Sequence, residues 1–390
     1  MSFVSRTLLF VCTIFFAALP VCGFDLNNDG NEDIVFCNYC CDDSYNLNSF
    51  IYFGDGKGNF RLGFELATHG ARGCAVSDLN NDGNYDLIIA NYSNGESRKI
   101  NSYIYWGKDF KRVSELPTVS GYGVSVSDFN KDGYKDIVFS NYSDGDHADI
   151  NSYIYWGDPE YKYETKTELP THGALGNSVD DFNNDGYPDI LFCNHNNEEI
   201  KAKSIIYFGS KDEPFKNKTQ IDTGYPYDST VADLNNDGYP DIVFSYFSDG
   251  NSFIFWGSKK MDYSQKTELK TDFATCNSVS DLDNDGYLDI IFSCYKNGDN
   301  YNINSYVYWG NSKNQYSERT QLPTRGAHGN SIADLNNDGN LDIIFSNHHD
   351  VNSIIYWGNG SRKYDKQTSI KTFGATAVST GNISSYGQNK

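Results

Sequence analysis

The chain has 390 residues and a formal net charge of −21, so nucleic acids and anionic membrane surfaces would repel it and we expect neither as a partner. Its 30 Tyr and 25 Phe against 2 Met, with abundant Gly, Asn and Asp, favour aromatic strands and polar turns over helices. We expect an all-β protein that attracts cations.

The N-terminal residues 1–23 predict an export signal peptide. Arg6 precedes an apolar run from Leu8 to Leu19, and Gly23 closes the segment. This run is too short to span a bilayer, which takes about 20 residues. We therefore expect a secreted, extracellular protein without membrane insertion, in which residues 24–390 form a single domain.

A nine-residue acidic pattern, D-x-[ND]-x-D-G-x-x-D, recurs seven times at spacings of 48 to 53 residues. Its copies start at Asp25, Asp78, Asp128, Asp181, Asp233, Asp281 and Asp334. Periods of this size are typical of repeat architectures. One supersecondary unit per repeat is therefore the simplest organisation of the chain.

Each repeat predicts four strands, and the third repeat shows them in chain order. The alternating run 123–128 (GVSVSD) precedes the acidic loop, and the apolar run 136–141 (DIVFSN) follows it. After a variable polar turn come 151–157 (NSYIYWG) and 163–171 (YETKTELPT). Seven four-stranded units predict a seven-bladed β-propeller, and an open solenoid is the alternative.

The two ends of the repeat region indicate how the ring closes. The first acidic loop, at Asp25, has no strand before it, while the segment Thr372 to Asn382 remains after the seventh unit. Its sequence TFGATAVSTGN resembles the strand that the first unit lacks. We expect this C-terminal strand to complete the first blade.

The acidic loops predict calcium sites. Calcium takes six to eight oxygen ligands. In each loop these oxygens would come from Asp or Asn side chains at positions 1, 3 and 5, a backbone carbonyl at position 7 and the Asp side chain at position 9. The glycine at position 6 allows the sharp turn that brings them together. An EF-hand would need Glu at position 12, where the first loop has Phe36. The alternative is that the loops are only Asn-Asp-Gly turns.

We expect up to seven Ca²⁺, mainly structural, because each site would join two strands of a blade. The predicted metal-binding residues are Asp25, Asn27, Asp29, Asn31, Asp33, Asp78, Asn80, Asp82, Asn84, Asp86, Asp128, Asn130, Asp132, Tyr134, Asp136, Asp181, Asn183, Asp185, Tyr187, Asp189, Asp233, Asn235, Asp237, Tyr239, Asp241, Asp281, Asp283, Asp285, Tyr287, Asp289, Asp334, Asn336, Asp338, Asn340 and Asp342.

The acidic loops, the strand ends such as Tyr105-Trp106-Gly107, and the Gly-Ala connections such as Gly70-Ala71 together resemble the FG-GAP or VCBS repeat family, which includes the heads of integrin α-subunits. The resemblance covers the chain after the signal. It implies a calcium-binding propeller with a role in extracellular binding or cell adhesion. Integrin heads carry the calcium loop in only some blades, whereas all seven units have it here.

Cysteines and glycosylation sequons add weaker signals. Cys37, Cys40, Cys41, Cys74, Cys193, Cys276 and Cys294 remain after the signal. We expect most to be small buried residues, and the alternative is a disulfide among the first three or from these to Cys74. Five N-x-S/T sequons begin at Asn91, Asn141, Asn217, Asn359 and Asn382.

A polar and aromatic ring is the candidate ligand site. Asn recurs after the second strand and before the third, where turn pairing explains it, and aromatic groups nearby could hold sugars. The aromatic members are Tyr92, Tyr142, His195, Tyr246 and His348.

We expect an extracellular binding or adhesion module for a protein or glycan partner. A lectin with repeated sugar pockets is the rival, and a polysaccharide-acting enzyme is a more distant one. Because no catalytic motif is present, we expect no enzymatic activity. The sequence leaves the oligomeric state open.

Overall fold

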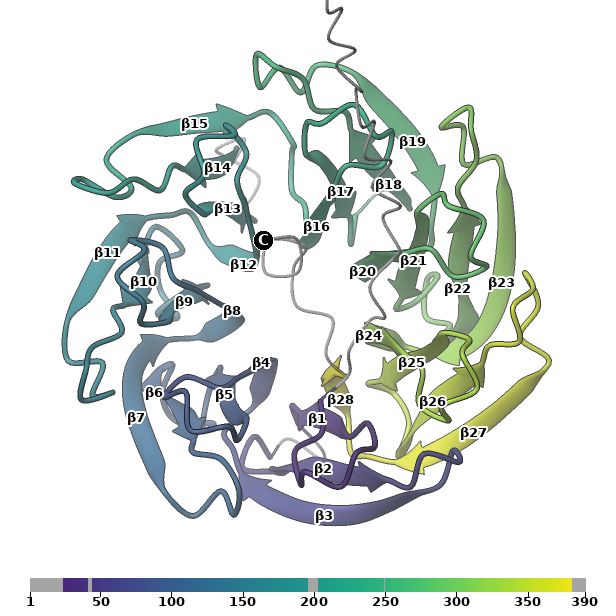
Figure 1. Ribbon diagram of the computed structural model, residues 1–390, viewed down its shortest axis with the longest axis horizontal. Coiled ribbons are helices and arrows are strands. Elements are labelled where there is room, and N and C mark those ends of the chain that lie inside the picture. Colours follow the sequence, from purple (N-terminus) through teal and green to yellow (C-terminus); the bar gives the residue numbers. More distant parts are fainter. Residues whose placement is uncertain (1–23, 41–43, 196–202, 249, 381–390) are drawn as a thin grey trace, which may run out of the picture.

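The computed structural model describes residues 24–40, 44–195, 203–248 and 250–380. These residues form seven four-stranded antiparallel sheets that lie around a central axis like the blades of a propeller (Figure 1). The predicted all-β, seven-bladed β-propeller is confirmed. Within these ranges no helix is long and apolar enough to cross a membrane. The predicted signal, residues 1–23, lies outside them.

Each blade runs from an inner strand beside the central channel to an outer strand at the rim. In this order the blades are β28 (Ala375–Ser379), β1 (Ile34–Asn38), β2 (Asn48–Gly54) and β3 (Phe60–Ala67); β4 (Ala71–Ser77), β5 (Asp86–Asn91), β6 (Lys99–Tyr105) and β7 (Val113–Val119); β8 (Gly121–Ser127), β9 (Asp136–Asn141), β10 (Asn151–Tyr155) and β11 (Lys166–Pro170); β12 (Ala174–Asp180), β13 (Asp189–Asn194), β14 (Ser204–Tyr207) and β15 (Lys218–Ile221); β16 (Asp228–Ala232), β17 (Asp241–Ser245), β18 (Asn251–Phe255) and β19 (Lys266–Lys270); β20 (Ala274–Ser280), β21 (Asp289–Cys294), β22 (Asn302–Trp309) and β23 (Glu318–Arg325); and β24 (Ala327–Ala333), β25 (Asp342–Asn347), β26 (Asn352–Trp357) and β27 (Lys366–Lys371).

The last strand closes the ring, as its sequence predicts. β28 pairs antiparallel with β1, with Val378 opposite Phe36. The Tyr52 hydroxyl on β2 also donates to the Lys371 carbonyl on β27 at 2.7 Å, which ties the first blade to the seventh. The first blade is thus built from both ends of the described chain.

The core lies between neighbouring blades. Second strands are buried along their whole length; in β9, Ile137, Val138 and Phe139 are all inaccessible to solvent. Outer strands alternate, so that Leu169 of β11 is buried between exposed neighbours and packs with Phe192 of the next blade. This alternation explains why apolar runs and mixed runs recur in turn along the sequence.

Tyrosines on the third strands bind one blade to the one before it. Tyr155 donates to the Pro117 carbonyl of the preceding blade at 2.5 Å, and Tyr207 donates to Pro170 at 2.7 Å. Tyr105, Tyr308 and Tyr356 do the same. A buried hydroxyl needs such a partner, so these contacts lock the spacing of the blades.

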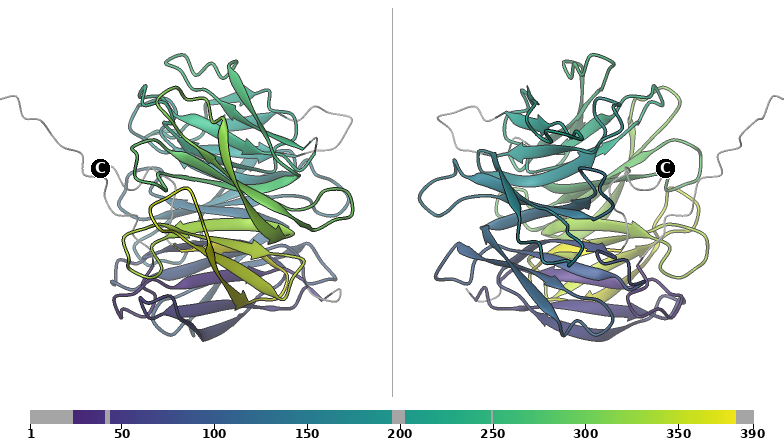
Figure 2. Two further views of the ribbon diagram at one scale, coloured as in Figure 1. Left: turned by 90° about the vertical axis from the view of Figure 1, so that its right-hand side faces the viewer. Right: turned by 60° about the vertical axis from the view of Figure 1, so that its left-hand side comes forward.

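The ring has two loop faces (Figure 2). The loops from first to second strand and from third to fourth strand lie on one side, which we call the acidic face because it carries the acidic loops. The loops from second to third strand and the connections between blades lie on the other side, which we call the collar face. A second strand of six residues separates the two faces by roughly 20 Å.

Candidate functional site

The acidic loops share one turn geometry. In the third loop the Asp128 carboxylate accepts the Asp132 N–H at 3.0 Å and the Gly133 N–H at 2.9 Å. The equivalent pair of bonds forms at position 1 of all seven loops. Gly133 has a φ of 93°, a conformation that glycine adopts without strain.

The aspartate at position 9 joins each loop to the third strand of its blade. Asp136 is fully buried and accepts the Phe129 N–H at 2.9 Å and the Gly157 N–H at 2.8 Å. Gly157 ends the Tyr-Trp-Gly segment, and the same two bonds recur in every loop. This explains why the strand-end glycines and the ninth-position acids recur together.

The electrostatics of these carboxylates favour a cation. The pKa of Asp136 is raised to about 7, chiefly by burial and also by the nearby charges of Asp132 and Asp128, while the two backbone hydrogen bonds lower it. The same balance raises the pKa of Asp86 to about 6 and that of Asp189 to about 8. Like charges converge in each loop, where a positive charge would stabilise their ionised forms.

Two loops leave oxygen atoms at position 3 buried without a hydrogen-bond partner. They are Asn27 Oδ1 in the first loop and Asp283 Oδ1 in the sixth. In the sixth loop the carboxylate oxygens of Asp281, Asp283 and Asp285 lie within 4.8 Å of one another. Convergent hard oxygens with unused lone pairs are the donor set that calcium prefers, so the residues present fit this ion.

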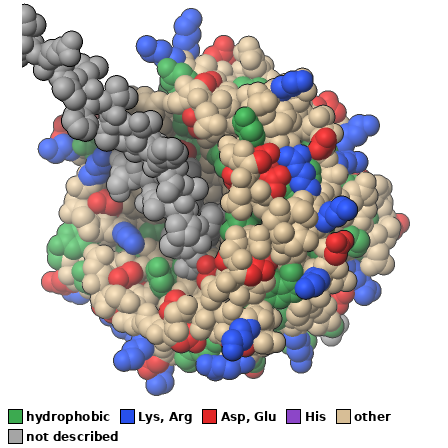
Figure 3. Space-filling view, turned by 45° about the vertical axis from the view of Figure 1, so that its right-hand side comes forward, with side chains coloured by type: hydrophobic (Ala, Val, Ile, Leu, Met, Phe, Trp, Pro, Cys, Tyr) green, Lys and Arg blue, Asp and Glu red, His purple; other side chains and the backbone are tan. Residues whose placement is uncertain are grey.

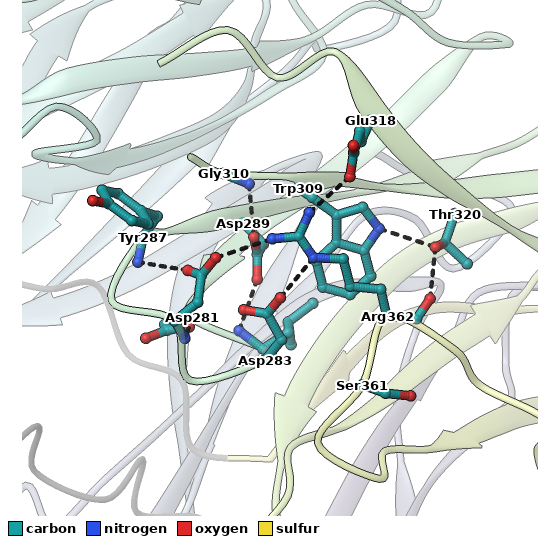
Figure 4. A network of polar contacts seen from close by, with 12 residues as sticks. Asp281, Asp283, Tyr287, Asp289, Trp309, Gly310, Glu318, Thr320, Ser361 and Arg362 are labelled. Carbon is teal, nitrogen blue, oxygen red and sulfur yellow. Dashed lines mark hydrogen bonds and ion pairs between the residues drawn. The ribbon is translucent and has the colours of Figure 1, made fainter. Parts of the chain in front are cut away.

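An arginine from the neighbouring blade reaches the sixth loop (Figure 4). Arg362 lies between β26 and β27, and its Nε is 2.7 Å from Asp283 Oδ2. Its other nitrogens pair with Asp285 at 3.0 Å and with Glu318 at 2.9 Å, while the guanidinium lies 5.2 Å from the centre of the Trp309 ring. The sixth loop thus already has a cation supplied by the protein.

The recurring asparagines on the collar face are structural. Asn91 is fully buried; its Nδ2 donates to the Asn101 carbonyl at 2.9 Å, and its Oδ1 accepts the His69 N–H at 3.0 Å. Asn38, Asn141, Asn194 and Asn347 make the same pair of contacts. The turn-pairing interpretation of these asparagines is confirmed.

The aromatic side chains beyond these asparagines form a closed circuit, which we call the collar. One residue from each blade contributes: Tyr39, Tyr92, Tyr142, His195, Phe247, Tyr295 and His348. Ring contacts join Tyr39 to Tyr92 at 5.8 Å, Phe247 to Tyr295 at 5.7 Å, and His348 back to Tyr39 at 5.8 Å. Tyr122 and Tyr227, from inside the ring, connect the remaining members.

The prediction that Tyr246 belongs to this aromatic ring was wrong. Tyr246 is buried and donates its hydroxyl to the Thr223 carbonyl at 2.6 Å, so it takes the place of the structural asparagine. Phe247, the next residue, is the collar member. Alignment of residues 241–247 with residues 136–142 without a gap places Tyr246 at the position of Asn141 and Phe247 at the position of Tyr142.

Thiols and sequons are also placed by the structure. Cys37, Cys74, Cys193, Cys276 and Cys294 are free thiols, and the buried thiol of Cys37 contacts that of Cys74 in the next blade; Cys41 lies outside the described ranges. The sequon asparagines Asn91 and Asn141 are fully buried, so a glycan on either would not fit the folded protein. Asn217 and Asn359 are exposed, and Asn382 lies outside the described residues.

Six overlapping segments of the chain match the family model of the FG-GAP-like repeat: residues 25–89, 78–139, 128–192, 181–244, 233–292 and 281–345. Each segment spans from one acidic loop to the second strand of the next blade. No curated protein matches the chain in sequence.

Solved propellers share the fold at low sequence identity. A periplasmic gluconolactonase of Pseudomonas aeruginosa has a TM-score of 0.62 at 12% identity, covering 90% of this chain and 99% of its own. A proposed 6-phosphogluconolactonase of Bacteroides uniformis has a TM-score of 0.60 at 11% sequence identity, with the same coverage of both chains. A lectin of Agrocybe aegerita that recognises non-reducing terminal N-acetylglucosamine has a TM-score of 0.54 at 16% sequence identity, and the match covers 91% of both chains.

These similarities correct one expectation. Two of the propellers that share the fold are named as lactonases, so the expectation of no enzymatic activity, which rested on the absence of a catalytic motif, is wrong. The same ring of blades serves both enzymes and binding proteins, because reactive groups lie on loops that vary independently of the fold.

Proposed function

The chain belongs to the FG-GAP-like repeat family, and on this premise we propose that it is a secreted, calcium-stabilised propeller that binds a protein or glycan partner through its collar face. The observation that carries the proposal is the collar itself. Seven aromatic or histidine side chains form one surface around the channel mouth, and most of them are half-buried. Such rings combine apolar faces with polar edges, which suits sugars and protein interfaces.

The repetition of the collar favours a ligand with repeated groups. Each blade presents one ring at an equivalent place, so several weak contacts would add to a stronger total affinity. This feature favours glycans within the proposal. On the face shown in Figure 3, Lys and Arg side chains are scattered among Asp and Glu, and no broad basic surface for nucleic acid is visible there.

Calcium has a structural part in this proposal. Side-chain oxygens at positions 1, 3, 5 and 9 of each loop and the carbonyl at position 7 would hold the ion, which would supply the positive charge that the clustered carboxylates favour. Support comes from the turn geometry shared by all seven loops and from the unpartnered oxygens of Asn27 and Asp283.

Glycan-array binding and protein capture from extracellular matrix extract test the binding proposal, using the protein loaded with calcium. Two collar variants, Phe247→Ser and Tyr295→Ser, should each weaken binding by about tenfold or more. Leu62→Ser is the control, because Leu62 is an exposed apolar residue (43%) on an outer strand. Unchanged binding in both collar variants would overturn the proposal, as would turnover of a lactone or polysaccharide in place of stable binding.

A further inference from the structure

Directly beneath the collar, the inner strands and, in the fifth blade, the residue just before β16 place one residue from each blade in a single layer, which we call the mouth layer. Each member lies six positions before the first residue of an acidic loop, or of the equivalent C-terminal segment. The layer consists of Arg72, Tyr122, Leu175, Tyr227, Thr275, His328 and Thr376. Most of these residues line a cavity of about 170 Å³ at the channel mouth.

Arg72 brings a positive charge into this layer. None of the ion pairs among the described residues includes Arg72. Its guanidinium lies 3.4 Å from the centre of the Tyr39 ring, and its Nε is buried without a hydrogen-bond partner. A guanidinium remains protonated in proteins, so the charge is permanent.

The two histidines beside Arg72 are neutral. Burial, followed by the charges of Arg72 and His348, lowers the pKa of His328 far below its ordinary value. Burial and the charge of Arg72 lower the pKa of His348 to about 3. Within the seven residues of the mouth layer, the positive charge therefore comes from Arg72 alone.

Hydrogen-bond donors outnumber acceptors around Arg72. His328 Nδ1 lies 3.0 Å from the Thr376 carbonyl and must donate to it, so the neutral ring offers a single lone pair at Nε2. Both Arg72 Nη1 at 3.1 Å and the Tyr227 hydroxyl at 3.0 Å approach this lone pair. Only one of them can use it.

The tyrosine hydroxyls do not remove the excess. Arg72 Nη1 also donates to the Tyr122 hydroxyl at 3.3 Å, and the hydroxyls of Tyr122 and Tyr227 contact each other. One proton serves the contact between the two hydroxyls, so the other hydroxyl proton competes with Arg72 for His328 or has no acceptor among the residues that the structure describes. With the free Nε–H, the mouth presents surplus donors around a fixed positive charge.

The remaining polar groups of the layer are already bonded to the backbone. Thr376 donates to the Ala71 carbonyl at 2.8 Å, and Thr275 donates to the His328 carbonyl at 2.9 Å. One carboxyl, Asp228, lines the same cavity one residue deeper in its strand. It accepts hydrogen bonds from Ser229, Cys276 and Asn277, and burial raises its pKa to about 6.

We propose that the channel mouth is a carboxylate-binding site in which Arg72, Tyr122 and Tyr227 hold the acid group of an acidic sugar while the collar rings pack against the sugar itself. The planar guanidinium suits a planar carboxylate, and the surplus donors supply the contacts that its oxygens need. The choice of a sugar rests on the proposed function of the collar face.

The test measures binding of sodium glucuronate by ligand-detected NMR and calorimetry at constant ionic strength, using the full chain with calcium. Glucuronamide, which has the same shape without the charge, is the matched probe. We expect glucuronate to bind about tenfold or more tightly than the amide. This comparison uses the unaltered protein and does not depend on whether any variant folds.

Variants then locate the site. Arg72→Gln should remove the preference for glucuronate over the amide, and Tyr227→Phe, which keeps the ring, should reduce it. Arg98→Gln is the control, because Arg98 also lies over the collar ring of Tyr92, at 5.4 Å, but donates to Ser143 outside the mouth layer. Melting temperatures confirm that each variant is folded.

Three results would overturn this inference: equal binding of glucuronate and glucuronamide, a preference that survives Arg72→Gln, or selective binding of peptides with a free C-terminal carboxylate in place of the sugar. Neutral glycans or proteins that bind the collar in the same samples would leave the proposed function standing while the inference falls. Absence of every ligand, neutral and acidic, would overturn both.

Discussion

Arg362 and Asp283 lie on different blades, yet their side chains form an ion pair of 2.7 Å at the centre of the sixth acidic loop. A calcium ion in this loop would need the same oxygens. The sixth loop is also the one with Asp at positions 1, 3 and 5. We infer that Arg362 and calcium compete there, which makes this loop the weakest of the seven for the ion.

Removing the arginine should therefore strengthen one calcium site. For Arg362→Gln we expect one site to bind calcium several-fold more tightly, with a loss of about 1 kcal/mol of stability in EGTA, because the ion pairs are partly exposed. Calcium titration calorimetry and urea unfolding measure the two effects. Arg325→Gln, which breaks the exposed pair of Arg325 with Asp350, is the control. Identical calcium titrations for both variants would contradict the competition.

The ninth-position aspartates should support the fold even without calcium. Asp136→Ala leaves two buried N–H groups unpaired, so we expect it to cost about 3 kcal/mol in EGTA. Asp132→Ala, at an exposed position of the same loop, should cost clearly less under the same conditions. Urea unfolding compares them. Equal losses for the two variants would contradict this metal-independent role of the Asp136 hydrogen bonds.

Ring closure predicts that β28 stabilises every blade. A chain that ends at Lys371 lacks this strand and should melt as one unit at a much lower temperature, or fail to fold, because the inner strands contact each other in an unbroken ring. A chain that ends at Thr380 keeps the strand and serves as the reference. Equal melting temperatures of the two shortened chains would contradict ring closure by β28.

His348 should make the collar sensitive to acid. The unfolded chain takes up a proton on this residue near pH 6.5, whereas the folded chain does so only at about pH 3. Stability linked to His348 is therefore complete above pH 6.5 and is lost as the pH falls through this window, by roughly 2 kcal/mol at pH 5.

The measurement is the difference in unfolding free energy between the unaltered chain and His348→Gln at pH 7 and pH 5. The variant should lose less stability on acidification, and parallel pH profiles would refute the effect. The difference isolates His348 from the titratable and charged groups that the structure describes around it: Cys40, Arg72, Tyr295, His328 and His349.

Much of the fold could be predicted because it repeats. The ring of seven blades and the closing strand follow from seven copies of one pattern and from the segment Thr372 to Asn382. The positions of the acidic loops follow in the same way. Because seven copies carry the same pattern, an error in interpreting one repeat would not have changed the predicted fold.

The collar and mouth layer were harder to predict because their residue types change from blade to blade. Phe247 was missed because Tyr246 occupies the asparagine position of its blade. Arg72, His328 and Tyr227 share a register only when counted back from each acidic loop, and a position that holds Arg, Tyr, Leu, Thr or His has no recognisable motif. Arg362 depends on how neighbouring loops meet in space, which a linear pattern does not encode.

Calorimetric melting with calcium and with EGTA, together with metal counting by mass spectrometry, tests the central claim most directly. We expect about seven bound Ca²⁺ in the unaltered protein at saturating calcium, with the sixth loop the last to fill. We also expect EGTA to lower the melting temperature by at least about 10 °C. A protein that carries no calcium and melts at the same temperature in EGTA would show that the loops are only turns.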